Sequence, residues 1–255
     1  QMVFDGKLSY EKYEELKKLI GSEVEIKKQD NQTQLKLPEE YKSILGSRDI
    51  LARHALSYLK SRGITKDDIE KYNIGYCEYG RYAKMIIIPS YDEQGNLNYF
   101  TGRSFEKEPF VKYRNPETSR DIVPFELFIN WDIPLVLCEG PFDAIAIKRN
   151  AIPLLGKNIQ QNLMKKIVTS KVEKIYIALD TDAQKQALKF AEYFINEGKE
   201  VYFMDLEGKD PSEMGFTNFT KLIQKTFPIN QYDLMKRKLQ LLWVKETLNI
   251  PTTGF

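Results

Sequence analysis

The fold is decided by residues 135–182, which open with Leu135-Val136-Leu137-Cys138 and break at Glu139-Gly140-Pro141-Phe142-Asp143. A second apolar run, Ile175-Tyr176-Ile177-Ala178-Leu179, ends in Asp180-Thr181-Asp182. Two short apolar runs separated by a helical pattern predict buried parallel strands of a strand–helix–strand unit. Because parallel strands end at the same edge of a sheet, the acids that follow them are expected to converge there.

A third apolar run, Val201-Tyr202-Phe203-Met204, is followed by Gly208-Lys209-Asp210-Pro211-Ser212, which adds another acid after a strand. Crowded carboxylates repel one another unless a cation neutralises them, and oxygen ligands favour a hard ion such as Mg²⁺ or Mn²⁺. The alternative is that these acids only cap the helices that follow, a common use of Asp. The sequence therefore predicts an α/β fold with a mostly parallel sheet and a metal site at its edge.

The composition narrows the class of protein. The 255 residues, 42% of them hydrophobic, can bury the core of one composite domain or two. With 38 basic and 36 acidic side chains, the net charge of +2 says little about partners. No apolar run approaches the roughly 20 residues that cross a bilayer, so we expect a cytoplasmic protein without membrane contact.

The soft metal ligands of the sequence are Cys77, Cys138 and His54. A structural zinc site needs four ligands, so none is expected within this chain. The two cysteines carry no pairing pattern, which suits a reducing compartment. His54 lies in a helical apolar pattern and is expected to be a half-buried packing residue.

The pattern along the chain predicts four segments. They are an N-terminal helix and linker at 1–47, a basic mixed α+β subdomain at 48–130, the α/β domain at 131–217 and a helical segment at 218–255. The expected helices lie at 8–20, from Ile50 to Gly63, from Thr65 onward with Thr65 as N-cap, and at 183–197, 218–227 and 230–248. A linker or a loose hairpin is expected at 27–36. A hairpin is expected from strands 84–89 and 97–101, closed by Gly102-Arg103.

Missing motifs narrow the reaction class. The sequence has neither a Gly-x-x-x-x-Gly-Lys-Ser/Thr phosphate loop nor Gly-x-Gly-x-x-Gly, and its single His leaves little room for a His-based triad. Metal-assisted phosphoryl or nucleotidyl transfer remains. The segment 109–118 mixes basic and aromatic residues that could stack on bases or ribose, although an exposed charged loop has the same composition.

These elements together resemble a known family. The runs 135–143, 179–182 and 208–211 resemble the TOPRIM domain of bacterial-type primases, topoisomerases and some nucleases. The preceding residues resemble DnaG-type primases in particular, through Tyr58-Leu59-Lys60-Ser61-Arg62-Gly63-Ile64, Gly102-Arg103 and Lys112-Tyr113-Arg114-Asn115-Pro116-Glu117-Thr118. The resemblance covers roughly residues 48–220, with short, phage-like spacings.

The resemblance implies a primase catalytic core that makes short RNA primers on single-stranded DNA from ribonucleoside triphosphates during DNA replication. Its catalytic residues would be Glu139, Asp180 and Asp182. Divalent metal would be held by Glu139, Asp143, Asp180, Asp182 and Asp210. Nucleotide or nucleic acid would be bound by Arg62, Arg103, Lys112, Arg114, Asn115 and Arg120.

Two departures from the family bear on partners. The family often has Asp-Pro-Asp where this chain has Asp210-Pro211-Ser212, so one outer ligand is absent or supplied by Glu213. The N-terminal zinc module of these primases cannot be built here, so we expect a part of a larger protein or a partner that supplies it. Residues 249–255 faintly resemble the entry to a helicase domain, so a replicative helicase, fused or separate, is expected. A TOPRIM nuclease and a non-catalytic DNA-binding scaffold remain the alternatives.

Overall fold

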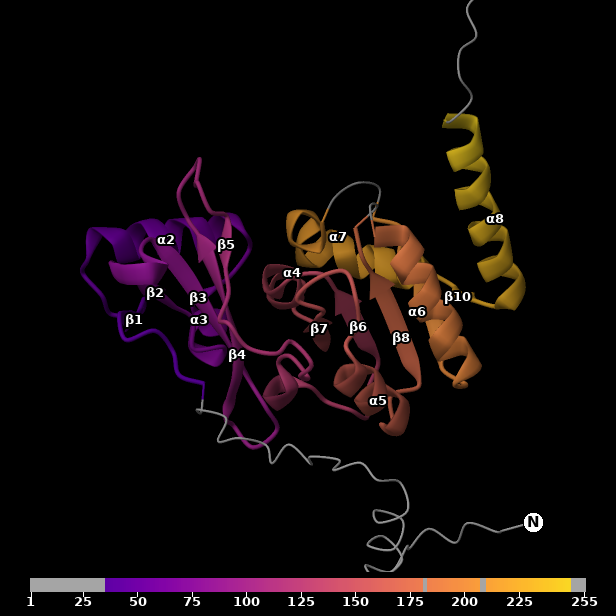
Figure 1. Ribbon diagram of the computed structural model, residues 1–255, viewed down its shortest axis with the longest axis horizontal. Helices are drawn as coiled ribbons and strands as arrows, with labels where there is room; N and C mark the ends of the chain where they lie inside the picture. Colours follow the sequence, from indigo (N-terminus) through magenta and orange to yellow (C-terminus); the bar gives the residue numbers. More distant parts are fainter. Residues whose placement is uncertain (1–34, 181–182, 207–209, 249–255) are drawn as a thin grey trace, which may run out of the picture. The chain divides into compact units, whose positions relative to one another are not determined.

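The computed structural model describes residues 35–180, 183–206 and 210–248, and only the backbone of residues 242–248. The described strands form two five-stranded sheets accompanied by helices (Figure 1). The α/β class predicted from the sequence is confirmed. The helix predicted at 8–20 and nearly all of the linker predicted at 27–36 lie outside the described residues.

The first sheet is antiparallel throughout, in the order β1-β2-β3-β4-β5. Its strands are β1 (Tyr41–Ser43), β2 (Gly75–Cys77), β3 (Met85–Tyr91), β4 (Leu97–Ser104) and β5 (Tyr113–Arg114). The predicted hairpin is confirmed as β3 and β4, but its closure at Gly102-Arg103 is wrong. These two residues lie within β4 and pair with both β3 and β5, so Arg103 stands on a central strand rather than on a turn.

Two helices belong to this part of the chain, α2 (Ile50–Ser61) and α3 (Lys66–Lys71), with short 3-10 turns η1 (Gly80–Tyr82) and η2 (Glu126–Phe128). The predicted N-cap of α3 is confirmed, because the Asp68 N–H donates to the Thr65 hydroxyl at 3.3 Å. The buried face of α2 carries Ala52, Ala55 and Leu59. His54 is exposed on the other side of that helix, so the half-buried position predicted for it is wrong.

The second sheet has the order β10-β9-β8-β6-β7 and is parallel except for β10 at its edge. Its strands are β6 (Leu135–Cys138), β7 (Ala151–Pro153), β8 (Lys174–Ala178), β9 (Glu200–Phe203) and β10 (Pro228–Ile229). The three predicted parallel strands are confirmed as β6, β8 and β9. The helical pattern after β6 is divided into α4 (Pro141–Ala146), the edge strand β7 and α5 (Gln161–Thr169).

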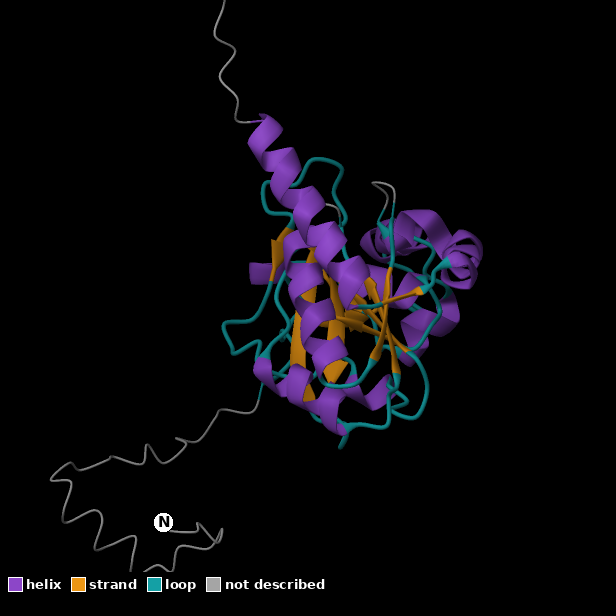
Figure 2. Ribbon diagram, turned by 90° about the vertical axis from the view of Figure 1, so that its right-hand side faces the viewer, coloured by secondary structure: helices purple, strands orange, loops and turns teal. Residues whose placement is uncertain are grey.

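Both faces of the second sheet are buried, which explains its continuous apolar strands. Val136 and Cys138 of β6 pack into one core cluster with residues of α4 and α7 (Pro211–Lys225), and Leu135 and Leu137 pack into the other with residues of α5 and α6 (Gln184–Asn196). Figure 2 shows strands of this sheet between helices, with α8 (Gln231–Leu248) alongside. The helices predicted at 183–197 and 230–248 are confirmed, whereas α7 begins at Pro211 and not at 218.

The two sheets share a core. The cluster that contains Val136 and Cys138 also contains Ile86 and Ile88 of β3 and Phe219 of α7. The carboxyl edge of the parallel sheet is therefore held against the part of the chain that carries β4 and β5. Among the described residues, no helix is long and apolar enough to span a membrane.

Candidate active site

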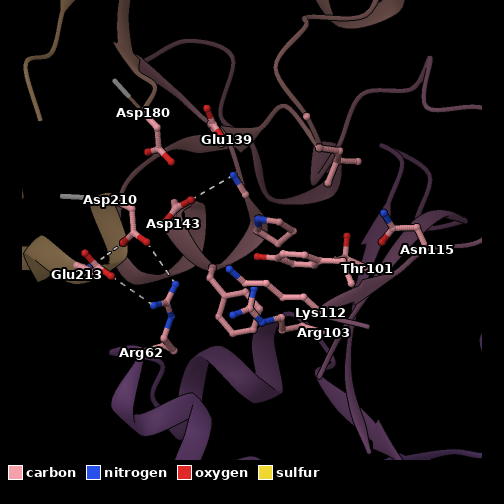
Figure 3. Close-up of a pocket in the computed structure, with 16 residues that line it drawn as sticks. Arg62, Thr101, Arg103, Lys112, Asn115, Glu139, Asp143, Asp180, Asp210 and Glu213 are labelled. Atoms are coloured by element: carbon pink, nitrogen blue, oxygen red, sulfur yellow. Dashed lines mark hydrogen bonds and ion pairs between the residues drawn. The ribbon is translucent and has the colours of Figure 1, made fainter. Parts of the chain in front are cut away.

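A pocket of about 500 Å³ lies where the carboxyl edge of the parallel sheet meets the antiparallel sheet. The lining includes eight side chains that the sequence analysis singled out: Glu139, Asp143, Asp180, Asp210, Arg62, Arg103, Lys112 and Asn115. Figure 3 shows the labelled acids on one side of the pocket and Arg103, Lys112 and Asn115 on the other. Residues as far apart in the sequence as Arg62 and Asp210, 148 positions, thus line one site with an acidic and a basic wall.

The acidic wall is built by strand ends and helix starts. Glu139 directly follows β6, and Asp180 lies two residues after β8. Asp210 is the N-cap of α7, where its carboxylate accepts hydrogen bonds from the Glu213 N–H and the Ser212 hydroxyl, both at 2.7 Å. The capping role that we considered as an alternative is therefore real for Asp210, and it fixes the carboxylate at the pocket rather than removing it.

Asp143 is the most enclosed of these acids, with 8% of its surface exposed. Its carboxylate accepts hydrogen bonds from the Gly140 N–H and the Ser212 N–H, both at 3.2 Å, and so joins the start of α4 to the start of α7. Burial, followed by the negative charges of Asp210 and Asp180, raises the pKa of Asp143 from 3.8 to about 6. The pKa shift thus comes first from burial and second from the carboxylates that lie near Asp143.

The basic wall is built on β4 and the residues around β5. Arg103 lies over the Tyr113 ring at 4.5 Å, a contact that holds the guanidinium at the pocket. Among the described residues, neither Arg103 nor Lys112 forms an ion pair with a carboxylate. The Nε atoms of Arg62 and Arg103 and Oδ1 of Asn115 are buried and have no hydrogen-bond partner within the described part of the chain. Buried polar atoms without partners are rare in native proteins, and here they gather at one pocket.

Arg62 connects the two walls from the C-cap of α2. One guanidinium nitrogen lies 3.4 Å from the Asp210 carboxylate and another 4.0 Å from that of Glu213 (Figure 3). Its side chain also lies over the Phe142 ring at 5.9 Å. A cation of the protein thus already stands beside part of the acidic wall.

Residues 134–206 match the family described as the Toprim domain. This part of the chain is a Toprim domain. The chain is 26% identical over 209 residues to a DNA primase of Aquifex aeolicus, an alignment that covers 63% of this chain and 42% of that protein. It is 30% identical over 213 residues to a DNA primase of Buchnera aphidicola, covering 75% of this chain and 35% of that protein. The chain thus spans less than half the length of either primase.

Solved structures support the same assignment at the level of the fold. A DnaG primase catalytic domain bound to ssDNA aligns with a TM-score of 0.64 at 20% identity, covering 78% of each chain. The zinc-binding and RNA polymerase domains of the Aquifex aeolicus primase align with a TM-score of 0.61 at 22% identity, covering 73% of this chain and 58% of that one. The described residues therefore have the fold of a DnaG-type catalytic core with its Toprim domain.

Three predicted site residues are not among the residues that line the pocket. Asp182 is outside the described residues, and Arg114 of β5 does not line the pocket. Arg120 does not line it either; its guanidinium donates hydrogen bonds to the Tyr99 hydroxyl and the Leu155 carbonyl. Among the residues that the structure describes, no three Asp, Glu, His or Cys side chains form a group able to hold one metal ion. The roles assigned to all these residues remain predictions.

Some residues that line the pocket were not predicted from the sequence. Thr101 lies two residues before Arg103 on β4, so strand alternation places both on one face and could have identified it. Leu155 and Gly156 line the Toprim side from the loop after β7, a strand that was not predicted. Glu213, considered only as a substitute ligand, also lines the pocket.

The cysteines take no part in this site. Cys77 and Cys138 are fully buried. Burial, with a smaller effect of the Glu40 charge, raises the pKa of the Cys77 thiol to about 12, and burial likewise raises the pKa of Cys138. Neither thiol is available as a thiolate nucleophile at neutral pH.

Proposed function

We propose that this chain is the catalytic core of a DNA primase, which joins ribonucleotides on a single-stranded DNA template during replication. The observation that carries the proposal is the pocket itself, in which Toprim carboxylates face Arg103 and Lys112, two cationic side chains without an ion pair to any described residue. A nucleoside triphosphate brings phosphates that suit Arg103 and Lys112, and the acids opposite suit a divalent cation. The fold and the primase relatives support the same reading.

The chemistry of the acidic wall suits a divalent metal, although no three of the described side chains form a metal-binding group. Its groups are carboxylates, the ligands that Mg²⁺ and Mn²⁺ prefer, and the pKa of Asp143 is raised by burial and by the charges of Asp210 and Asp180. Asp180, Asp182 and Asp210, together with Glu139, would hold the metal, with Asp143 in support. When bound, the metal supplies Lewis-acid stabilisation of phosphate charge. The possible zinc ligands are Cys77 and Cys138, which are buried, and His54, which is exposed. Three such scattered residues do not provide the four ligands of a structural zinc site, so we propose that zinc is bound elsewhere.

The two walls have different roles in the proposed reaction. Arg103, Lys112 and Asn115 bind the incoming triphosphate, and Arg62 adds a positive charge beside Asp210. Glu139 accepts the proton of the primer 3′-hydroxyl, which attacks the α-phosphate of the nucleotide while pyrophosphate leaves. Arg114 contacts the template backbone outside the pocket, so template binding should weaken with salt.

The partners follow from the same proposal. One related catalytic domain was solved with ssDNA, which supports single-stranded DNA as template here. Another relative carries a zinc-binding domain beside its polymerase domain, which supports a zinc module supplied by a partner or by another part of the protein. We further propose a replicative helicase as partner, fused or separate, and action in the cytoplasm of a bacterial or phage-infected cell.

The test is incubation of the protein with labelled single-stranded DNA, ribonucleoside triphosphates and Mg²⁺ or Mn²⁺. We expect short RNA products from wild type and none from Glu139→Gln or Asp180→Asn, while Asp132→Asn, an exposed acid paired with Lys171, stays active. Cut DNA without RNA would instead identify a nuclease. DNA binding without metal and without turnover would identify a scaffold.

A further inference from the structure

We infer that Arg120 is a positioning residue that fixes the separation between the basic and acidic walls of the pocket, an inference that rests on the proposed function. Its Nε donates to the Tyr99 hydroxyl at 3.2 Å, and its Nη1 donates to the Leu155 carbonyl at 3.3 Å. One guanidinium thus connects β4 to the loop after β7. The planar fork of arginine suits such a bridge, because its donors point in fixed directions.

On the basic side, the anchor is rigid and belongs to the pocket wall. Tyr99 is 1% exposed, in the middle of β4. Thr101 and Arg103 follow at intervals of two along the same strand, so all three side chains stand on one face of the sheet. A group that is tied to the Tyr99 hydroxyl is therefore tied to the surface that carries Arg103.

On the acidic side, the anchor continues into the backbone of Glu139. The Leu155 N–H donates to the Glu139 carbonyl at 3.1 Å, which extends the β6–β7 pairing beyond both strands. Leu155 has a φ of 56°, a left-handed conformation that non-glycine residues rarely adopt, and Gly156 follows with a φ of 152°. Such a loop needs outside contacts to hold its shape, and Arg120 supplies one at the Leu155 carbonyl.

The backbone of Arg120 is itself fixed to the Toprim domain. The next residue, Asp121, accepts from the Asn162 backbone N–H at 2.8 Å through its carboxylate and from the Asn162 amide at 2.7 Å through its carbonyl. Asn162 lies in the first turn of α5. The guanidinium therefore reaches back from a fixed point to both walls, which distinguishes Arg120 from a mobile surface cation.

The experiment compares Arg120→Gln, Arg120→Lys and Tyr99→Phe with Arg53→Gln, a control that removes an exposed arginine of α2. In primer synthesis, Arg120→Gln should lower kcat by about 10- to 100-fold with KM for the nucleotide within about twofold, since misplacement by about 1 Å can slow a reaction 100-fold. Arg120→Lys should remain slow, because an ammonium cannot bridge both acceptors. Tyr99→Phe should be milder, and the double variant Tyr99→Phe/Arg120→Gln no slower than Arg120→Gln.

Two further measurements separate positioning from DNA contact and from the proposed function. The salt dependence of single-stranded DNA binding should match that of Arg53→Gln, whereas a lost phosphate contact would reduce the slope of log K against log salt by about 0.7. Hydrogen exchange of the Leu155 amide should be at least about tenfold faster in Arg120→Gln. Unchanged exchange, normal kcat or a reduced salt slope would overturn the inference. If wild type makes no primer, the proposed function fails, and the exchange result still decides the bridge.

Discussion

Replacing Asp143 with asparagine should change how the stability of the protein depends on pH. Asp143 is 8% exposed and accepts two backbone hydrogen bonds, yet its pKa is raised from 3.8 to about 6 by burial and by Asp210 and Asp180. The folded protein therefore binds the Asp143 proton more tightly than the unfolded chain. The stability from this proton is complete below about pH 4 and is lost as the pH rises through about 6.

The size of the effect follows from the same pKa. A rise from 3.8 to about 6 corresponds to about 3 kcal/mol of unfolding free energy, at about 1.36 kcal/mol per pH unit. Asparagine does not titrate, but its amide turns a donor toward the N–H of Gly140 or Ser212, a loss of about 1–2 kcal/mol at every pH. Relative to wild type, Asp143→Asn should thus gain about 2.5 kcal/mol between pH 4 and pH 7.5.

The assay is urea unfolding of both proteins in a chelator at a series of pH values. Asp132→Asn, an exposed acid whose side chain is 64% accessible, should show no such trend. Repeating the series with millimolar Mg²⁺ should shrink the difference between wild type and Asp143→Asn, because a bound cation favours ionised carboxylates. If the difference between the two proteins stays constant within about 1 kcal/mol from pH 4 to pH 7.5, the electrostatic reasoning is wrong.

Four further outcomes follow from the pocket and from α7. Lys112→Gln should raise KM for the nucleotide about tenfold and leave the melting temperature unchanged, since Lys112 is exposed and forms no ion pair with a described residue. Arg62→Gln should lower the Mg²⁺ concentration for half-maximal primer synthesis by about two- to fivefold, because it removes a cation 3.4 Å from Asp210. Asp210→Asn should abolish primer synthesis at wild-type stability, whereas Asp210→Ala should also lower the unfolding free energy by about 1 kcal/mol. Gly215→Ala should destabilise the protein by about 1–2 kcal/mol in urea unfolding, since the φ of 70° strains any side chain even though the new Cβ would meet no other described part of the fold within 4 Å.

The sequence was most informative where strands are long and apolar. The apolar runs ending at Cys138, Leu179 and Met204 predicted three parallel strands, which the structure has as β6, β8 and β9. Parallel geometry then predicted that the acids after these runs lie at one edge of the sheet. Short elements were not recoverable in this way. Strand β7 has three residues and ends in Pro153, and α4 has six, so neither shows a period that could separate them.

Some missed features had a local signal, and others had none. Helix α7 begins with an aspartate N-cap and with Pro211 at N1, which is a standard start signal. Gly215 interrupts the apolar period of this helix, and the helix was therefore predicted to begin only at residue 218. The hydrogen bond from Arg120 to Leu155 joins residues 35 positions apart, so sequence alone could show only a basic side chain in a basic segment. The partners of the Arg120 side chain can be known only from the fold.

The capping and metal-binding interpretations of the strand-end acids are compatible, and the structure explains why. A helix N-terminus offers free N–H groups and a positive dipole end, so it fixes the orientation of a carboxylate beside it. In Asp210 one oxygen accepts from Glu213 and Ser212, while the other faces Arg62 at the pocket. In Asp143 both oxygens accept backbone N–H groups, and the side chain is nearly closed off from solvent. Capping thus leaves Asp210 with an oxygen directed at the pocket and commits Asp143 to joining α4 and α7, which is why we propose Asp210 as a ligand and Asp143 as its support.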